Sequence, residues 1–382
     1  MLSSMERRVD VSEWVEFQWP YLMAFLGGET RVAELARETG AFERARKIAS
    51  PSDLLRLLLF RVGGGHSLMD TATVAAEAGV ADLSDAALVK RFAKAGDWLG
   101  RLLCEAIGWN EQQRLPGLSV EVVDATTIGR QGSKGTDHRL HLRVDLASNC
   151  VVEAELTDGK GGETLERFAI RPASVVIADA GYAHRGPLGR IAERGAHFIV
   201  RFSWSTLPLE NESSEPLDLL ATLEALPEAE PGEFPVFFRT PEGSRIKARL
   251  VAIRKSEPAA AHTRQRIRQE ASKRQRQIDL RTLQFAGFTF LLTNLPEEIS
   301  TTSVLALYRF RWQVEMKFKV LKSLLDLDHV PARTDDGVRV WVFAKLLLAL
   351  LVDALIEQAE SFPPWGYPIP DREHLASDGA AS

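Results

Sequence analysis

The periodicity of the apolar residues changes near Leu118, and this change constrains the architecture more than any other feature. Up to about residue 115, apolar residues recur at helical spacing, as in SPSDLLRLLLFRV and SDAALVKRFAKAGDWLGRLLCEAIGW. Ser50 or Ser52 and Ser84 are candidate N-caps of these helices. From Leu118 onward the apolar runs are short and alternate with polar residues, as in LSVEVVDAT, RLHLRVDLA and CVVEAELT. We therefore predict an all-helical region over residues 1–115, followed by a unit built on a β-sheet.

The order of the following segments predicts an α/β fold. After the first three strands, the pattern predicts a helix near 163–170, a strand at SVVIADA, a helix over about 186–194 and a strand at AHFIVRF. The order β-β-β-α-β-α-β indicates a mixed sheet flanked by helices, which occupies residues 116–204.

The second half of the chain is expected to interrupt this sheet unit and then resume it. Residues 205–286 combine a proline-containing acidic linker, two β-like runs and a basic stretch, and we expect a β-rich insertion there. GFTFLLTNLP then predicts one more strand and SVLALYRFRWQVEMKFKVLKSLL a long helix, within a second part of the core over 287–360. Residues 361–382 are expected to form a loose tail.

Length and composition limit the class of protein. A chain of 382 residues is longer than one compact core, and 45% hydrophobic with 26% charged residues is typical of globular proteins. Cys104 and Cys150 have no CxxC spacing, which disfavours a disulfide framework or a cysteine zinc site and fits the cytoplasm. The N-terminus MLSSMERRVDVSEW has no apolar core typical of a signal peptide. The apolar stretch 338–356 contains three charged residues, so we expect a buried helix and no membrane association.

The charge is distributed unevenly along the chain. A net charge of −5 does not by itself indicate a nucleic-acid partner. Residues 210–233 carry acids and no base, whereas 254–281 are rich in bases. Such a run is usually a solvated face, yet a basic block in an acidic chain is also a candidate for contacting DNA phosphates. The candidates are Arg264, Arg266, Arg268, Lys273, Arg274 and Arg276.

Two aspartates follow hydrophobic strands. Asp124 ends LSVEVVD, and Asp179 ends SVVIAD. A carboxylate at the end of a buried strand is costly unless it serves a ligand or a hydrogen-bond network. The alternative for each aspartate is a capping role in a turn or at the start of the next helix, and the sequence leaves both open.

One face of the expected long helix carries a second set of polar residues. Tyr308, Arg311, Glu315 and Lys322 fall within an arc of about 60° at helical spacing. The neighbouring stripe is apolar and consists of Phe310, Val314, Phe318 and Leu321. Two cations and a hydroxyl around one carboxylate suit the binding of phosphate and metal together. With Asp124 and Asp179, Glu315 would offer oxygen ligands alone, which favours Mg²⁺ or Mn²⁺ over zinc.

The segment YRFRWQVEMKFKVLK matches the signature Y-x2-R-x3-E-x6-K at Tyr308, Arg311, Glu315 and Lys322. In this signature the chain resembles the insertion-sequence-four family of DDE transposases. VVDATTI and ADAGYAHRGPLGRIAERGAHFIVR also resemble the segments of that family around its two aspartates. The resemblance covers about residues 119–204 and 285–350.

The resemblance implies a ribonuclease H-like core, interrupted by a β-rich insertion and preceded by a helical DNA-binding region. It implies that Asp124, Asp179 and Glu315 bind two Mg²⁺ or Mn²⁺ ions, while Tyr308, Arg311 and Lys322 hold backbone phosphates. The implied activity is metal-dependent cleavage of insertion-sequence ends, followed by attack of the freed 3′-hydroxyl on target DNA. The implied partner is double-stranded DNA, both terminal repeats and target, bound by a dimer.

One departure from the family and two alternative functions stay open. Relatives place a tryptophan on the strand corresponding to GFTFLLTN, where this chain offers only Phe288 or Phe290, so a hairpin route of cleavage is in doubt. A ribonuclease H-like nuclease without strand transfer is one alternative function. A transposon-derived DNA-binding protein without catalysis is the other, and the three retained acids argue against it.

The remaining polar candidates have simpler interpretations. His138 and His141 in HRLH are expected on opposite faces of a strand, which disfavours a metal pair. His184 follows Asp179 closely enough to contact DNA or water, although a surface role is the simpler expectation. Turn or surface positions are expected for Asp137, Asp145 and Asp158, the end of the long helix for Asp326 and Asp328, and a packing role for Trp312.

Overall fold

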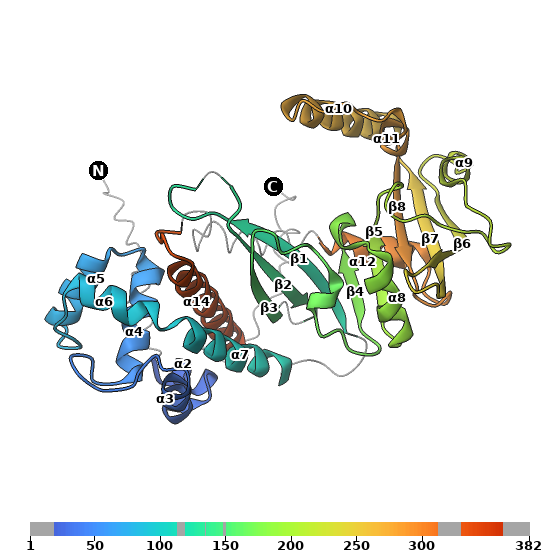
Figure 1. Cartoon of the computed structure of the whole chain (residues 1–382). Helices are drawn as coiled ribbons and strands as arrows, with labels where there is room; N and C mark the ends of the chain where they lie inside the picture. Colours follow the sequence, from blue (N-terminus) through green and yellow to red (C-terminus); the bar gives the residue numbers. More distant parts are fainter. Residues whose placement is uncertain (1–18, 113–118, 134, 148–149, 312–329, 362–382) are drawn as a thin grey trace, which may run out of the picture. The chain divides into compact units, whose positions relative to one another are not determined.

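The computed structural model describes residues 19–112, 119–133, 135–147, 150–311 and 330–361 (Figure 1). By their contacts the residues divide into two compact units, Met1–Trp109 together with Ala332–Ser382, and Asn110–Pro331. We call them the helical unit and the sheet unit and describe each by itself. Among the described residues, no helix combines the length and the hydropathy needed to cross a membrane.

Helices make up the helical unit, as the periodicity predicts (Figure 1). Ser50 caps α4 by accepting a hydrogen bond from the Asp53 backbone N–H at 3.0 Å, and Ser84 caps α6 in the same way. Of the two alternatives for the first cap, Ser50 is therefore the correct one. The helices are α2 (Trp19–Phe25), α3 (Gly28–Glu38), α4 (Pro51–Gly64), α5 (Leu68–Glu77), α6 (Asp85–Ala93), α7 (Gly96–Gln112) and α14 (Asp335–Ser361).

Helix α14 is the apolar stretch that we expected to be a buried helix. Its residues contact α4 and α6, so it belongs with the helical unit, although sequence order grouped it with the sheet unit. Its charges are accommodated locally, because Arg339 pairs with Asp97 at 2.7 Å and the Lys345 ammonium lies 5.2 Å from the centre of the Trp341 ring. A helix that is apolar on most sides needs neighbours around it, and the leucines of α4 supply them.

The sheet unit contains one mixed sheet of eight strands in the order β3-β2-β1-β4-β5-β8-β7-β6 (Figure 1). β1, β2 and β3 form the expected antiparallel meander, and β4 and β5 run parallel to β1. The strands are β1 (Val120–Ile128), β2 (His138–Asp145), β3 (Cys150–Asp158), β4 (Val175–Ala178), β5 (His197–Arg201), β6 (Pro231–Arg239), β7 (Arg245–Arg254) and β8 (Phe288–Thr293). This order and the flanking helices are those of a ribonuclease H-like fold.

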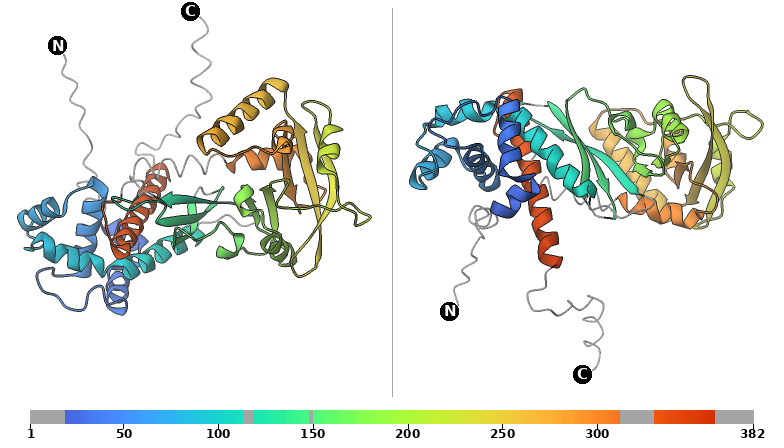
Figure 2. Two further views of the ribbon diagram at one scale, coloured as in Figure 1. Left: turned by 45° about the horizontal axis from the view of Figure 1, so that its top comes forward. Right: turned by 90° about the horizontal axis from the view of Figure 1, so that it is seen from below.

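The insertion between β5 and β8 extends this sheet instead of forming a sheet of its own. β6 and β7 pair with each other, and β7 pairs with β8. The segment also contains α9 (Leu219–Glu224), and its basic part forms α10 (Glu257–Lys273), followed by α11 (Leu280–Phe285), as Figure 2 shows from two further sides. The expected β-rich character is therefore present, with the basic stretch on a helix.

Two helices expected from the sequence differ in the structure. At 163–170 only one 3-10 turn forms, η1 (Leu165–Arg167), because Thr164 and Phe168 on either side are extended. Helix α12 (Thr301–Arg309) ends before Phe310, whose N–H donates to the Leu307 carbonyl and tightens the last turn. The rest of the expected long helix, from residue 312 onward, lies outside the described residues. Phe310 is 44% exposed, so it does not belong to a buried apolar stripe.

The hydrophobic core around β4 determines the position of Asp179, which follows this strand directly. All four residues of β4 are buried, and α8 (Arg185–Glu193) packs its Leu188 and Ile191 into the same core as Val176 and Ala178. The chain leaves this core directly after Ala178. Asp179 is therefore the first polar side chain at the end of a fixed strand.

Candidate metal centre

Asp124 and Asp179 lie at the same level of two neighbouring parallel strands. The register pairs Val122 of β1 with Ile177 of β4, and each aspartate stands two residues beyond this pair. Both side chains are half-buried. Asp124 does not end its strand as expected, because β1 continues to Ile128 along β2. Only the parallel pairing with β4 stops before it.

Asp179 also caps the turn that follows it. Its Oδ1 accepts a hydrogen bond from the Gly181 backbone N–H at 2.9 Å, at the start of η2 (Ala180–Tyr182). Asp124 Oδ1 similarly accepts from the Ala125 N–H at 2.8 Å. The capping role that the sequence left open is therefore real for Asp179. It fixes one carboxylate oxygen and is compatible with a ligand at the other.

Glu163 is a third carboxylate at this place, and sequence reasoning missed it. Arg139 Nη1 lies 3.3 Å from Glu163 Oε1. Burial raises the pKa of Glu163, and the nearby Asp179 raises it further. No motif or spacing marks Glu163, which follows a glycine pair in the turn after β3, so only the folded chain reveals it.

Tyr182 places a buried hydroxyl among these carboxylates. The residue is fully buried, and its hydroxyl has no hydrogen-bond partner among the described residues. Burial raises its pKa, and the charges of Asp124, Glu163 and Asp179 raise it further, so the phenol stays neutral and can donate. A buried hydroxyl without a partner costs about 1–3 kcal/mol, which is recovered when a polar ligand accepts its hydrogen bond.

The first half of the signature segment reaches the same site. The Arg311 guanidinium lies 5.8 Å from the centre of the Tyr308 ring. Burial raises the pKa of Tyr308, while the charges of Arg311, Arg201 and Asp179 also act on it. Tyr308 is thus close enough to Asp179 and to Arg201, at the end of β5, for their charges to act on it, and Arg311 lies beside Tyr308. The sequence analysis did not single out Arg201.

The second half of the signature, Glu315 and Lys322, lies outside the described residues, as do Trp312, Asp326 and Asp328. Within the described part of the chain, no group of three or more Asp, Glu, His or Cys side chains is arranged to hold a metal ion. Asp124 and Asp179 supply two hard oxygen ligands, and Tyr182 supplies a hydroxyl beside them. These groups fit a divalent ion that requires one further carboxylate.

The basic candidates on and after α10 fall into different environments. Arg264 is committed within the protein, since its Nε donates to the Leu283 carbonyl at 3.2 Å and its guanidinium pairs with Glu257 at 2.7 Å. Arg274 pairs with Glu270 at 2.8 Å. Arg266 and Lys273 line a hollow together with Arg201, and Arg268 and Arg276 are exposed. Two of the candidates, Arg266 and Lys273, therefore lie next to the strand end that carries Arg201, in a hollow that Glu270 also lines.

The other polar candidates have local roles. The His184 ring Nε2 lies 3.1 Å from the Glu163 carbonyl, so His184 ties two loops together. Asp137 pairs with Arg130 at 3.0 Å, and Asp158 accepts from the Lys160 N–H in a turn. Asp145 is buried instead of lying at the surface, because the Ser119 hydroxyl donates to it at 3.0 Å.

His141 leads to a prediction about pH. It is fully buried on β2, and burial, together with Arg167, lowers its pKa to about 4. In the unfolded chain His141 takes up a proton below about pH 6.5, whereas the folded chain does so only near pH 4. Stability contributed by neutral His141 is therefore complete above pH 6.5 and falls as the pH decreases.

Between pH 7 and pH 5 we expect a loss of about 2 kcal/mol in the free energy of unfolding, measured by urea titration. His141→Gln should lack this part of the loss, and an unchanged pH dependence would contradict the assignment.

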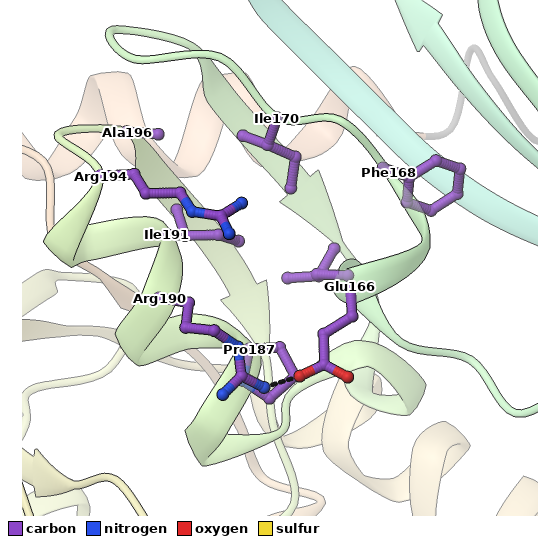
Figure 3. A pocket seen from close by; sticks show the side chains of 9 residues that line it. Glu166, Phe168, Ile170, Pro187, Arg190, Ile191, Arg194 and Ala196 are labelled. Atoms are coloured by element: carbon purple, nitrogen blue, oxygen red, sulfur yellow. Dashed lines mark ion pairs between the residues drawn. The ribbon is translucent and has the colours of Figure 1, made fainter. Parts of the chain in front are cut away.

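A separate hollow lies between η1 and α8. Figure 3 shows Arg190 and Glu166 pointing toward one another across it, and the two side chains form an ion pair. Phe168, Ile170 and Ile191 line the rest. Glu166, three residues after Glu163, is thus held in an ion pair with Arg190 of α8.

Fold and site together define a ribonuclease H-like protein with a carboxylate pair at neighbouring parallel strands. Residues 116–351 match the family model described as the Transposase DDE domain. The chain is 34% identical to the putative transposase InsL for insertion sequence element IS186A of Escherichia coli strain K12, over 91% of this chain and 96% of that protein. It is also 34% identical to the transposase for insertion sequence element IS421 of Escherichia coli, with the same coverage. A more distant relative is the transposase for insertion sequence element IS231F of Bacillus thuringiensis subsp. israelensis, 25% identical over 83% of this chain and 75% of that protein.

The chain belongs to the DDE transposase family. It is a transposase, an enzyme that cleaves DNA and transfers the cut strand, and its partner is DNA. Membership also implies dependence on divalent metal ions.

Proposed function

We propose that Asp124, Asp179 and Glu315 together hold two Mg²⁺ or Mn²⁺ ions, and that the enzyme acts in the cytoplasm on the ends of an insertion sequence. The observation that carries this proposal is the placement of Asp124 and Asp179 at one level of two parallel strands. Tyr308 and Arg311 precede Glu315 in the sequence; the charge of Asp179 acts on Tyr308, and Arg311 lies beside the Tyr308 ring. Ions held by these carboxylates would supply activation of a water or a 3′-hydroxyl and stabilisation of the leaving oxygen.

The residues of this chain would position DNA around the carboxylates. The Tyr308 hydroxyl can donate to a phosphate oxygen, and the Arg311 guanidinium and the Lys322 ammonium can bind phosphate as cations. Burial raises the pKa of Tyr308, so its hydroxyl stays protonated and can donate a hydrogen bond. Arg201 acts on the same hydroxyl through its charge and lines the hollow with Arg266 and Lys273.

These cations form a path for the DNA backbone that leads from α10 to Asp179. We propose that the basic residues Arg264, Arg266, Arg268, Lys273, Arg274 and Arg276 contact phosphates along it. Arg266, Arg268 and Lys273 should contribute most, since Arg264 and Arg274 already pair with acids in the protein.

The triple variant Arg266→Gln, Arg268→Gln, Lys273→Gln tests this path. Neutralising a cation that binds phosphate should flatten the dependence of log affinity on log salt by about 0.9 on duplex DNA, so the three together should change it by roughly 2.7. Binding to DNA carrying the element ends is measured over a series of salt concentrations. Arg239→Gln is the matched control, because Arg239 is exposed in the same unit and paired with Glu210. An unchanged slope in the triple variant would make α10 a solvated helix face.

A strand-joining assay separates the proposed transposition reaction from simple nuclease action. Purified full-length protein is mixed with labelled element ends, a target plasmid and Mg²⁺ or Mn²⁺. We expect cleavage at the ends and covalent joining of the 3′ strand to the plasmid, carried out by two copies of the chain paired on DNA. Cleavage without joined product would favour a ribonuclease H-like nuclease. End binding without cleavage would favour a DNA-binding protein derived from a transposon.

A further inference from the structure

The turn that carries Asp179 contacts Glu163, a residue of a distant loop. We propose that Glu163 is a positioning residue for Asp179, which fixes the turn over residues 179–184 against β2 so that Asp179 faces Asp124. This inference rests on the proposed metal site. It adds to that site a residue that is not part of the Y-x2-R-x3-E-x6-K signature.

Glu163 makes contacts on three sides. Its carboxylate pairs with Arg139 of β2, with 3.3 Å between Arg139 Nη1 and Glu163 Oε1. Its backbone carbonyl lies 3.1 Å from His184 Nε2, at the far end of the turn. Its other carboxylate oxygen lies against Gly181, whose N–H donates to Asp179. Glu163 therefore lies between β2 and the turn and contacts the turn at Gly181 and His184.

Gly181 is needed for this arrangement. A Cβ at position 181 would overlap the Glu163 carboxylate and would lie 3.1 Å from Asp179 Oδ1. Oxygen atoms of Glu163 and Asp179 thus border the same small space, which only the hydrogen of a glycine leaves open. The obstacle to a larger residue is the movable end of the Glu163 side chain, so a substitution here would displace Glu163 in preference to the backbone.

Tyr182 indicates independently that the space beside these carboxylates receives a ligand. Its hydroxyl is fully buried and has no partner among the described residues, while Asp124, Glu163 and Asp179 all act on it electrostatically. Buried hydroxyls in proteins are almost always hydrogen-bonded. Water on a divalent ion at Asp124 and Asp179 would provide the missing partner, because such water donates strongly and the tyrosine oxygen can accept.

A positioning role fits Glu163 better than direct ligation. Arg139 already offsets its charge, and the described acids do not form a group of three arranged to hold an ion. Residues that orient a metal ligand typically change metal affinity by about 10–100-fold when they are replaced. Their loss weakens binding without abolishing it.

The experiment is a calorimetric titration of full-length, DNA-free protein with Mn²⁺, which reports metal affinity without catalysis. We expect Glu163→Gln to weaken Mn²⁺ binding by about tenfold or more, with the thermal unfolding temperature of the metal-free protein close to that of wild type. Glu166→Gln is the matched control, because Glu166 lies three residues after Glu163 and pairs with Arg190 of α8 instead, and it should bind Mn²⁺ like wild type. Wild-type affinity in Glu163→Gln would overturn the proposal. Asp179→Asn tests the metal site itself, and its binding Mn²⁺ like wild type would instead contradict the proposed function.

Gly181→Ala leaves residue Glu163 itself unchanged, so it keeps the proposal testable if Glu163→Gln folds poorly. Gly181→Ala should displace the Glu163 carboxylate and weaken Mn²⁺ binding to a similar extent. In a Glu163→Ala background the obstacle is gone, so Gly181→Ala should add little further loss. Independent, multiplicative effects of the two substitutions on the affinity would contradict a shared role.

Discussion

We expect Asp124→Asn, Asp179→Asn and Glu315→Gln each to abolish DNA cleavage and to leave binding to the element ends largely intact. The reason is that an amide keeps the size of the side chain but loses the charged oxygens that hold a divalent ion. The ions contribute several kcal/mol to the stabilisation of the transition state, and each 1.4 kcal/mol corresponds to about tenfold in rate. The cleavage rate should therefore fall by at least about a thousandfold.

The measurement combines two assays on the same purified proteins. A gel-shift titration gives affinity for labelled element ends, and a denaturing gel gives the rate of strand cleavage in Mg²⁺. Asp137→Asn is a suitable control, because Asp137 is an acid of the same sheet unit that pairs with Arg130. Retained cleavage by any one of the three variants would remove that residue from the site.

Glu121→Gln should lower the free energy of unfolding by about 3–5 kcal/mol, the largest stability effect that we expect for this chain. Glu121 is fully buried in β1 and its Oε2 lies 2.7 Å from Arg143 Nη1 of β2. Arg143 is buried as well and also bonds Glu153, with 2.9 Å between Nε and Oε2. The substitution leaves a buried guanidinium without its principal counter-charge.

Urea unfolding of full-length protein, followed by fluorescence, tests this prediction at pH 7. The control is the double variant Glu121→Leu, Arg143→Met, in which both charges are replaced by apolar groups of similar size and much of the loss should be recovered. If Glu121→Gln lowered the free energy of unfolding by less than about 1 kcal/mol, the Glu121–Arg143 pair would not be the buried, stabilising ion pair that we infer. The pair joins β1, the strand that carries Asp124, to β2, so it helps to hold that strand in place.

The strands of the core could be predicted from the sequence because their periodicity is local. The runs around Val122, Val176 and Phe198 alternate or are wholly apolar, and each forms a strand where expected. Because β1 and β4 are neighbouring parallel strands, their ends share one edge of the sheet, so the level placement of Asp124 and Asp179 could also be expected. That β1 extends past Asp124 to Ile128 depends on pairing with β2, which no local pattern records.

The parts that sequence could not supply depend on contacts between distant segments. Glu163 reaches Asp179 only because η1 replaces the expected helix and the chain turns back toward β4. Arg201 acts on Tyr308 because the last residue of β5 is positioned within range of it, and these two residues are far apart in the sequence. The assignment of α14 to the helical unit comes from its packing on α4 and α6, which sequence order does not record.

The most direct test of the central claim is to map the metal site on the polypeptide itself. Full-length protein is loaded with Fe²⁺ in place of Mg²⁺ and treated with ascorbate and hydrogen peroxide, so that radicals formed at the ion cut the nearby backbone. Mass spectrometry then locates the cuts. A shared site predicts cuts near residues 124, 179 and 315, all suppressed by excess Mg²⁺ and by Asp179→Asn. Cuts near 124 and 179 without any near 315, or cuts that Mg²⁺ does not suppress, would contradict a site formed by these three carboxylates.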